Sequence, residues 1–180
     1  MPSIGDLLFA FTEWLRTTQL TEFSLWISNT PLSIWIGGHF WAIPIIQTLH
    51  ILAIAAAFGS VLMINMRILG ITGGGSTVAA TAARYLPWIW VALAVLIVTG
   101  IGMIVGEPVR ELINPIFWMK MAAIVLMVLL SVWFQARVRH LAGSNPGSEA
   151  RAGVRIGAVA IIVLWCVIIV CGRWIAYAPV

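Results

Sequence analysis

Residues 44–69 read PIIQTLHILAIAAAFGSVLMINMRIL, a stretch in which His50 and Arg67 are the only ionisable side chains. A helix needs about 20 consecutive, predominantly apolar residues to cross the hydrocarbon core of a bilayer. This stretch meets the requirement, so it predicts a transmembrane helix.

Three further stretches are long and apolar enough to span a membrane, at residues 86–105, 116–136 and 154–177. Of the 180 residues, 62% are hydrophobic and 9% are charged, whereas about 25% are charged in ordinary soluble domains. A chain this short cannot close a β-barrel, and lipid tolerates no open sheet edge. We therefore predict an all-α integral membrane protein, a bundle of four transmembrane helices in contact with the lipid bilayer.

The chain before the first span has a different character. Between Asp6 and Arg16, apolar residues recur at helical spacing, and Asp6, Glu13 and Arg16 are charged. This pattern is typical of amphipathic helices that lie in a membrane interface, and we expect one or two of them within residues 3–29. Residues 32–43 form either another interfacial helix or the first turns of a long helix kinked at Pro44. We divide the chain into an N-terminal interfacial segment, 1–43, and the bundle, 44–180.

The basic residues predict the orientation. Arg67 and Arg84 flank the connection between the first two spans, and four further arginines lie around the third connection, whereas the second connection carries one Arg against two Glu. Cytoplasmic loops carry an excess of Lys and Arg, so the first and third connections are predicted to be cytoplasmic and both termini to lie outside. No basic run is interleaved with aromatic residues, which argues against a nucleic acid partner.

Three basic residues lie inside spans away from the arginine-rich connections and need an explanation: His50, Lys120 and Arg173. Each lies one or two turns inside the outer boundary of its helix, so three helices bring basic groups to one depth. Ionisable residues within a membrane are functional-site candidates by default. The structural alternatives are that Lys120 and Arg173 extend to the headgroups and that His50 is a buried histidine with a hydrogen-bond partner.

Small residues follow His50 on nearly the same side of the helix, at Ala53, Ala56, Ala57 and Ser60. Such a strip usually means close helix packing, but it also suits a planar macrocycle beside its axial ligand. A neutral imidazole is a strong iron ligand, and Lys or Arg can neutralise the propionates of a haem. We therefore expect haem b, with His50 as the metal ligand and Lys120 and Arg173 at the propionates.

Two more residues near the first span are candidates for cofactor binding, Gln47 and His39. On an unbroken helix His39 and His50 would lie about 16 Å apart, too far to hold one iron. His39 is thus a second axial ligand, a second site or an interfacial residue, and we favour the last. The methionines, which suit Cu(I), indicate copper only weakly because Met is a common apolar filler.

The run Leu49-His50-Ile51-Leu52, the segment Asn65 to Gly70, and the segments 114–120 and 172–177 together resemble a bacterial inner-membrane family of unassigned function. The resemblance spans residues 44–177, and it implies a location in the bacterial inner (cytoplasmic) membrane. The termini, which the arginine pattern places outside, are then predicted to be periplasmic. Asn65 stands where that family tends to have Asp. More distantly, the Leu-His-Ile start and Lys120 are similar to the CopD-type group, which includes the membrane protoporphyrinogen oxidases. That resemblance implies a porphyrin site at His50 and Lys120.

Three functional hypotheses follow. The first is a cytochrome b-like protein that transfers electrons between a periplasmic partner and the quinone pool. The second is a porphyrinogen oxidase-like enzyme that uses the same His and Lys to hold its substrate. The third is a cofactor-free accessory subunit of a larger membrane complex, with other membrane or periplasmic subunits as partners.

Overall fold

The computed structural model describes residues 3–72, 75, 77–141 and 148–177, and within these ranges it is helical without strands. In chain order the elements are α1 (Ile4–Arg16), α2 (Gln19–Ser28), α3 (Pro31–Gly38), α4 (Ala42–Leu69), α5 (Val78–Gly106), α6 (Pro108–Leu112), α7 (Pro115–Leu141), α8 (Ser148–Trp174) and the 3-10 turn η1 (Ile175–Tyr177).

Four of these helices have the length and hydropathy of membrane spans: Ala42–Leu69, Val78–Gly106, Pro115–Phe134 and Ala152–Trp174. Between 11% and 33% of the residues in the most apolar part of each span are buried inside the protein. The remaining apolar side chains face outward, where lipid must cover them. The fold class predicted from sequence is confirmed, and the chain is a multi-pass membrane protein.

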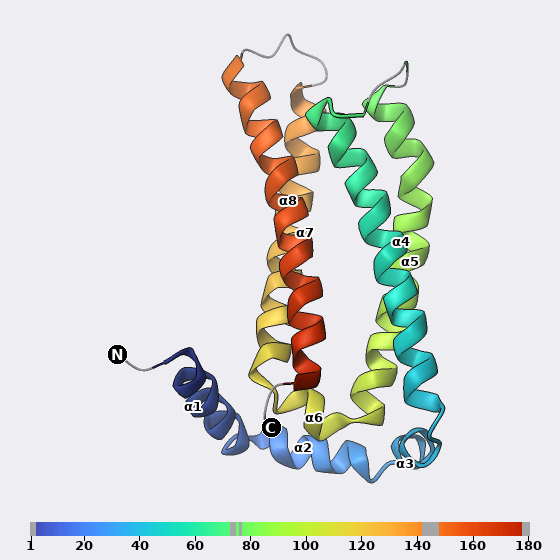
Figure 1. Ribbon diagram of the computed structural model, residues 1–180, viewed down its shortest axis with the longest axis vertical. Helices are drawn as coiled ribbons and strands as arrows, with labels where there is room; N and C mark the ends of the chain where they lie inside the picture. Colours follow the sequence, from blue (N-terminus) through green and yellow to red (C-terminus); the bar gives the residue numbers. More distant parts are fainter. Residues whose placement is uncertain (1–2, 73–74, 76, 142–147, 178–180) are drawn as a thin grey trace.

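The four spans form two antiparallel hairpins, α4 with α5 and α7 with α8 (Figure 1). The hairpins contact each other mainly through α4 and α8. Helices α1, α2, α3 and α6 lie together with η1 at one end, which we call the α6 end. The last turns of α4 and α7 and the first turns of α5 and α8 lie at the other, which we call the loop end. The helix ends joined by the first and third connections therefore share one end of the bundle, as the arginine pattern requires.

Small residues allow the helices to approach closely in the core. Ala57 of α4 and Ala158 of α8 are fully buried in a cluster that includes Trp165. Gly157 packs against the ring of Phe134, because a Cβ at Gly157 would lie 2.7 Å from the Phe134 Cδ2 atom. Without a hydrophobic driving force between helices in lipid, this packing holds a bundle together.

Helix α5 begins earlier than the apolar stretch, which starts at Leu86. The side chain of Thr77 caps α5 by accepting a hydrogen bond from the Ala80 amide at 3.1 Å. Hydropathy marks only the part of a helix that lies in hydrocarbon, whereas the cap determines where the helix starts. Pro87 is consequently inside α5 rather than near its start.

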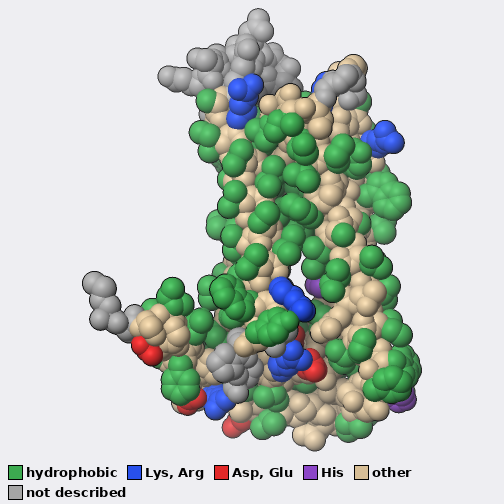
Figure 2. Space-filling model, in the orientation of Figure 1, with side chains coloured by type: hydrophobic (Ala, Val, Ile, Leu, Met, Phe, Trp, Pro, Cys, Tyr) green, Lys and Arg blue, Asp and Glu red, His purple; other side chains and the backbone are tan. Residues whose placement is uncertain are grey.

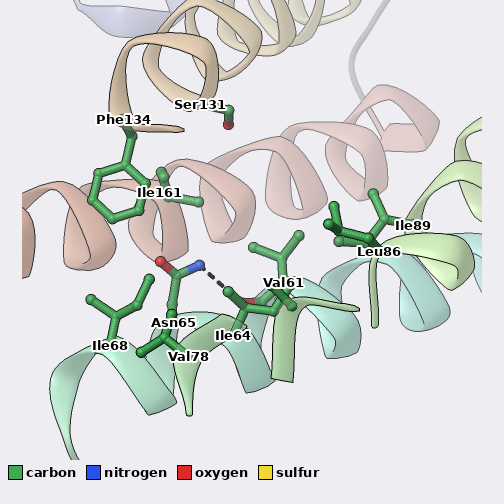
Figure 3. Close-up of a pocket in the computed structure, with 11 residues that line it drawn as sticks. Val61, Ile64, Asn65, Ile68, Val78, Leu86, Ile89, Ser131, Phe134 and Ile161 are labelled. Carbon is green, nitrogen blue, oxygen red and sulfur yellow. Dashed lines mark hydrogen bonds between the residues drawn. The ribbon is translucent and has the colours of Figure 1, made fainter. Parts of the chain in front are cut away.

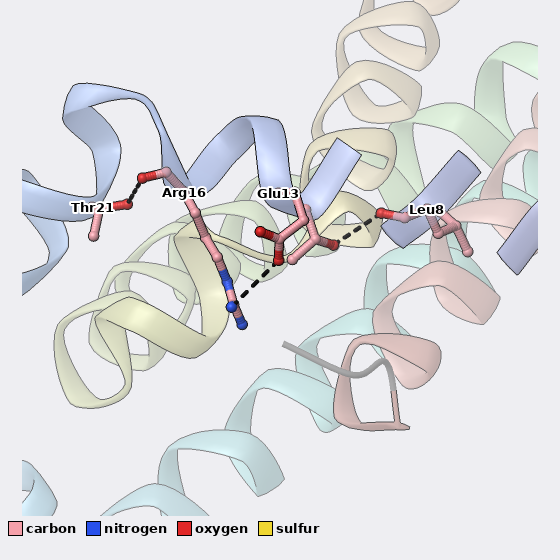
Figure 4. Close-up of polar contacts among 5 residues, drawn as sticks. Leu8, Glu13, Arg16 and Thr21 are labelled. Carbon is pink, nitrogen blue, oxygen red and sulfur yellow. Dashed lines mark hydrogen bonds and ion pairs between the residues drawn. The ribbon is translucent and has the colours of Figure 1, made fainter. Parts of the chain in front are cut away.

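The N-terminal segment forms three short helices. Figure 4 shows the polar contacts near the α1–α2 junction, where Thr21 donates to the Arg16 carbonyl at 3.0 Å and Arg16 pairs with Glu13 at 3.4 Å. The third helix, α3, is separate from α4, as the interfacial alternative expected. Pro44 lies in the first turn of α4, where a helix tolerates proline without a kink.

Candidate functional site

His50 is anchored to the neighbouring helix. Its Nδ1 atom lies 2.7 Å from the hydroxyl oxygen of Thr99 on α5. His50 comes eight residues after the start of α4, and Thr99 comes seven before the end of α5. In an antiparallel hairpin these two positions lie at the same depth. Counting residues from the ends of the two helices would therefore have predicted from the sequence that His50 and Thr99 are neighbours. Gly100 leaves the imidazole room, because a Cβ there would lie 3.7 Å from the His50 Cε1 atom.

The second hydrogen bond of Thr99 determines the tautomer of His50. The Thr99 hydroxyl donates to the Val95 carbonyl at 2.6 Å. The single hydrogen of this hydroxyl points at the Val95 carbonyl, which cannot donate. The Thr99 oxygen must therefore accept its other hydrogen bond from the imidazole. The proton of a neutral His50 therefore sits on Nδ1, and Nε2 keeps its lone pair. Metal-ligating histidines have this arrangement, in which one ring nitrogen is oriented by a partner and the other is left to bind.

Lys120, on α7, is within electrostatic range of His50. Its ammonium group is near enough to act electrostatically on His50 and on Glu111. The aliphatic part of Lys120 passes over Gly172 of α8, where a Cβ would lie 3.9 Å from its Cδ atom. The aliphatic part of the Lys120 side chain therefore packs against α8 and is not surrounded by lipid alone.

Glu111 is a member of this cluster that the sequence analysis missed. It lies on α6, between two spans, and its side chain is 8% exposed. Burial raises the pKa of the Glu111 carboxyl, and the positive charges of Lys120 and Arg110 oppose that rise. An acidic residue in a connection normally lies in water, so only the tertiary fold reveals that this one is buried.

The segments 114–120 and 172–177, which carried the family resemblance, meet at the α6 end. Asn114 is fully buried, accepts a hydrogen bond from the Ile116 amide at 2.9 Å and donates to the Ile175 carbonyl at 3.2 Å. The Trp118 indole donates to the Leu112 carbonyl at 2.9 Å. These bonds join α6, the start of α7 and η1, and they fix the depth at which Lys120 leaves α7.

Arg173 is placed less favourably for a shared site. It is exposed, and its guanidinium donates to the Tyr177 hydroxyl at 2.8 Å and lies 5.2 Å from the centre of the Tyr177 ring. Gln47 is also exposed on α4. Of the three basic residues singled out from the sequence, the structure brings His50 and Lys120 into electrostatic range.

His39 ends α3 at the α6 end of the protein. Its Nδ1 atom lies 2.6 Å from the Trp35 carbonyl, and its ring packs against Trp35 and Trp41 with centroids 4.6 and 5.5 Å apart. It caps a short helix and sits among the aromatic residues that membrane proteins concentrate at the interface. This environment fits the interfacial alternative.

On the face shown in Figure 2, basic, acidic and histidine side chains gather between the two hairpins near the α6 end, while the spans around them are apolar. Within the described residues, no group of three His, Cys, Asp or Glu side chains converges. A metal held by the protein alone needs several such ligands. A porphyrin brings four nitrogen ligands of its own, so a single imidazole is enough for it.

Residues 13–178 match the family of unknown function DUF6644. The chain belongs to the DUF6644 family. No curated protein and no solved structure matches the chain.

The DUF6644 match begins inside α1 and ends after η1, so it includes all four spans, α2, α3 and α6. The short helices at the α6 end are thus part of the family's domain. Membership agrees with the resemblance to a membrane family of unassigned function, whereas the likeness to the CopD-type group stays an expectation that rests on His50 and Lys120.

Proposed function

We propose that this protein binds a b-type haem at the α6 end, between its two hairpins, and transfers electrons between a periplasmic partner and the quinone pool. The Nε2 atom of His50 would bind the iron, and Lys120 would hold a propionate. The bound haem would supply a reversible one-electron iron couple. The observation that carries the proposal is the hydrogen bond through which Thr99 leaves Nε2 of His50 with its lone pair.

The residues present fit this group. An iron porphyrin needs a neutral imidazole of fixed orientation, which the His50–Thr99–Val95 chain of hydrogen bonds provides. The propionates need a nearby cation, and Lys120 is in electrostatic range of His50. Glu111 would oppose propionates if it were ionised, but burial raises the pKa of its carboxyl and favours the neutral form.

An absorbance spectrum tests the proposal. The wild-type protein, purified from cells with ample haem, should show Soret and α bands that respond to reduction, and His50→Ala should lose them. His39→Ala is the matched control, because His39 is a second imidazole at the same end, packed between two tryptophans; it should keep the bands. A wild-type protein without pigment, or pigment that survives in His50→Ala, would end the proposal.

A cofactor-free accessory subunit is the second candidate. The observation that favours it is that His50 and Arg173 both have protein partners, Thr99 and Tyr177, as structural residues would. In that case the His50–Thr99 bond serves to join α4 to α5. A His50→Ala variant that assembles and functions like wild type would favour this role.

A further inference from the structure

A pocket lies in the half of the bundle toward the loop end, away from the proposed haem site. It has a volume of about 280 Å³ and is lined by all four long helices. Most of its lining is aliphatic or aromatic, including Leu86 of α5, Phe134 of α7 and Ile161 of α8. The polar side chains in the lining are Asn65 of α4 and Ser131 of α7.

Asn65 brings an unsatisfied acceptor to this pocket. Its side chain is 3% exposed, and its Nδ2 atom donates to the Val61 carbonyl at 2.9 Å. Its Oδ1 atom is buried without a hydrogen-bond partner, and in the part of the chain that the structure describes no other buried side-chain nitrogen or oxygen is in that position. In Figure 3 this oxygen lies on the side of the amide facing Phe134 and Ile161.

The orientation of the amide is fixed by chemistry. Rotating the amide by half a turn would set Oδ1 against the Val61 carbonyl, placing two acceptors face to face. Only Nδ2 can serve that carbonyl, so Oδ1 points away from it, and Asn65 lines the pocket. A buried acceptor without a donor is costly, and the pocket is where a donor would have to come from.

The surroundings restrict what the donor can be. A buried water typically makes about three hydrogen bonds, whereas the lining offers two polar side chains, Asn65 and Ser131, among mainly apolar ones. An acyl chain would fill the space but has no donor. An engineered apolar cavity of about 150 Å³ holds one benzene, so the larger volume here accommodates a ring with substituents.

We propose that this pocket binds the head group of a membrane-soluble hydroquinone, with one ring hydroxyl donating to Oδ1 of Asn65. The ring occupies the apolar space between Leu86, Phe134 and Ile161. The binding rests on the pocket alone; its meaning for electron transfer rests on the proposed function. Since Oδ1 can only accept, the Asn65 side of the site favours a ring hydroxyl over a group that only accepts hydrogen bonds.

The test measures equilibrium binding of three probes to the full chain in nanodiscs made from quinone-free lipid, under anaerobic reducing conditions where a redox-active probe is used. The probes are a short-chain hydroquinone, the corresponding quinone and the hydroquinone dimethyl ether. The hydroquinone should bind saturably, and the ether and the quinone should bind at least about tenfold more weakly, the effect of one lost hydrogen bond in a desolvated site.

Two variants locate the site. Asn65→Leu removes the acceptor at nearly constant size, and Ala82→Leu fills the pocket from α5 without touching the amide; each should weaken hydroquinone binding at least about tenfold. Thr48→Val, an exposed position on α4 distant from the pocket, is the control. Equal binding of all three probes, unchanged binding in Asn65→Leu, or no saturable binding at all would overturn the inference.

His50→Ala separates this inference from the proposed function. That variant should lose the haem spectrum and keep hydroquinone binding, because His50 does not line the pocket. If the protein contains haem but binds no hydroquinone, this inference is wrong and the proposed haem site is unaffected. If the protein binds hydroquinone but contains no haem, the proposed function is wrong and the pocket assignment is unaffected.

Discussion

Thr99 is the residue on which the chemistry of His50 depends. A threonine within a helix commonly donates its hydroxyl hydrogen to a carbonyl of the preceding turn. Because Thr99 does so here, its oxygen is left to accept a hydrogen bond from His50 on α4. Ligand orientation by such an outer partner typically changes metal affinity about 10- to 100-fold. A single hydroxyl therefore decides whether the imidazole is ready to bind.

Replacing that hydroxyl tests its role. Thr99→Val keeps the shape of the side chain and should weaken haem retention about 10- to 100-fold, while Thr99→Ser should restore it. The haem-to-protein ratio after dialysis measures the effect, and the melting temperature reports separately on folding. Wild-type retention in Thr99→Val would show that the hydrogen bond does not orient a ligand.

Glu111 should make stability depend on pH. Burial raises the pKa of its carboxyl in the folded protein above the ordinary value of 4.5. The folded state then binds more protons than the unfolded state, so this group's contribution to stability is present below that ordinary value and is lost as pH rises through the folded pKa. Melting temperatures of wild type and Glu111→Gln should converge in acid, with the variant the more stable near neutral pH. A constant difference between the two across that range would contradict the assignment.

At the scale of elements, the α7–α8 hairpin depends on a glycine. Small residues let two membrane helices approach closely, and Gly157 of α8 provides such a position for the ring of Phe134 on α7. The ring covers the glycine closely enough that no Cβ fits without a shift of the ring.

Gly157→Val should therefore destabilise the protein by about 1–3 kcal/mol, the usual cost of overpacking. Pairing it with Phe134→Leu should recover part of the loss, because the smaller side chain makes room. Gly153→Ala is the control, since a Cβ there meets nothing within 4 Å. Unfolding in a mixed-micelle denaturant series measures all of them. Equal effects at positions 153 and 157 would refute the packing argument.

At the scale of the whole molecule, hydropathy was sufficient to predict the spans, because lipid imposes one requirement on every residue of a span. The contacts that build the site were not predictable in the same way. His50 and Thr99 are 49 positions apart, and Glu111 lies in a connection where sequence gives no sign of burial. The shared depth of His50 and Lys120 was predictable, because the number of residues from a span boundary can be counted. The exposure of Arg173 was not, because it depends on how α8 is rotated about its axis, and a uniformly apolar sequence does not determine that rotation.

The orientation in the membrane is the remaining prediction at this scale. In a variant with Cys166 and Cys171 replaced by serine, a cysteine at Glu22 on α2 should react with a membrane-impermeant maleimide added from the periplasmic side. A cysteine at Ala79, beside the first connection, should react only after the membrane is opened. Both positions are exposed on the protein. The reverse pattern of labelling would invert the topology drawn from the arginines.

The two proposed sites occupy opposite halves of α4. His50 and Asn65 are fifteen residues apart on that helix, about 22 Å along its axis, in a hydrocarbon layer about 30 Å thick. An electron passing from one site to the other would travel through most of the membrane's electric field, which is worth about 2.3 kcal/mol per charge for each 100 mV. Turnover would then slow down or speed up with the voltage across the cell envelope, and the protein would be electrogenic.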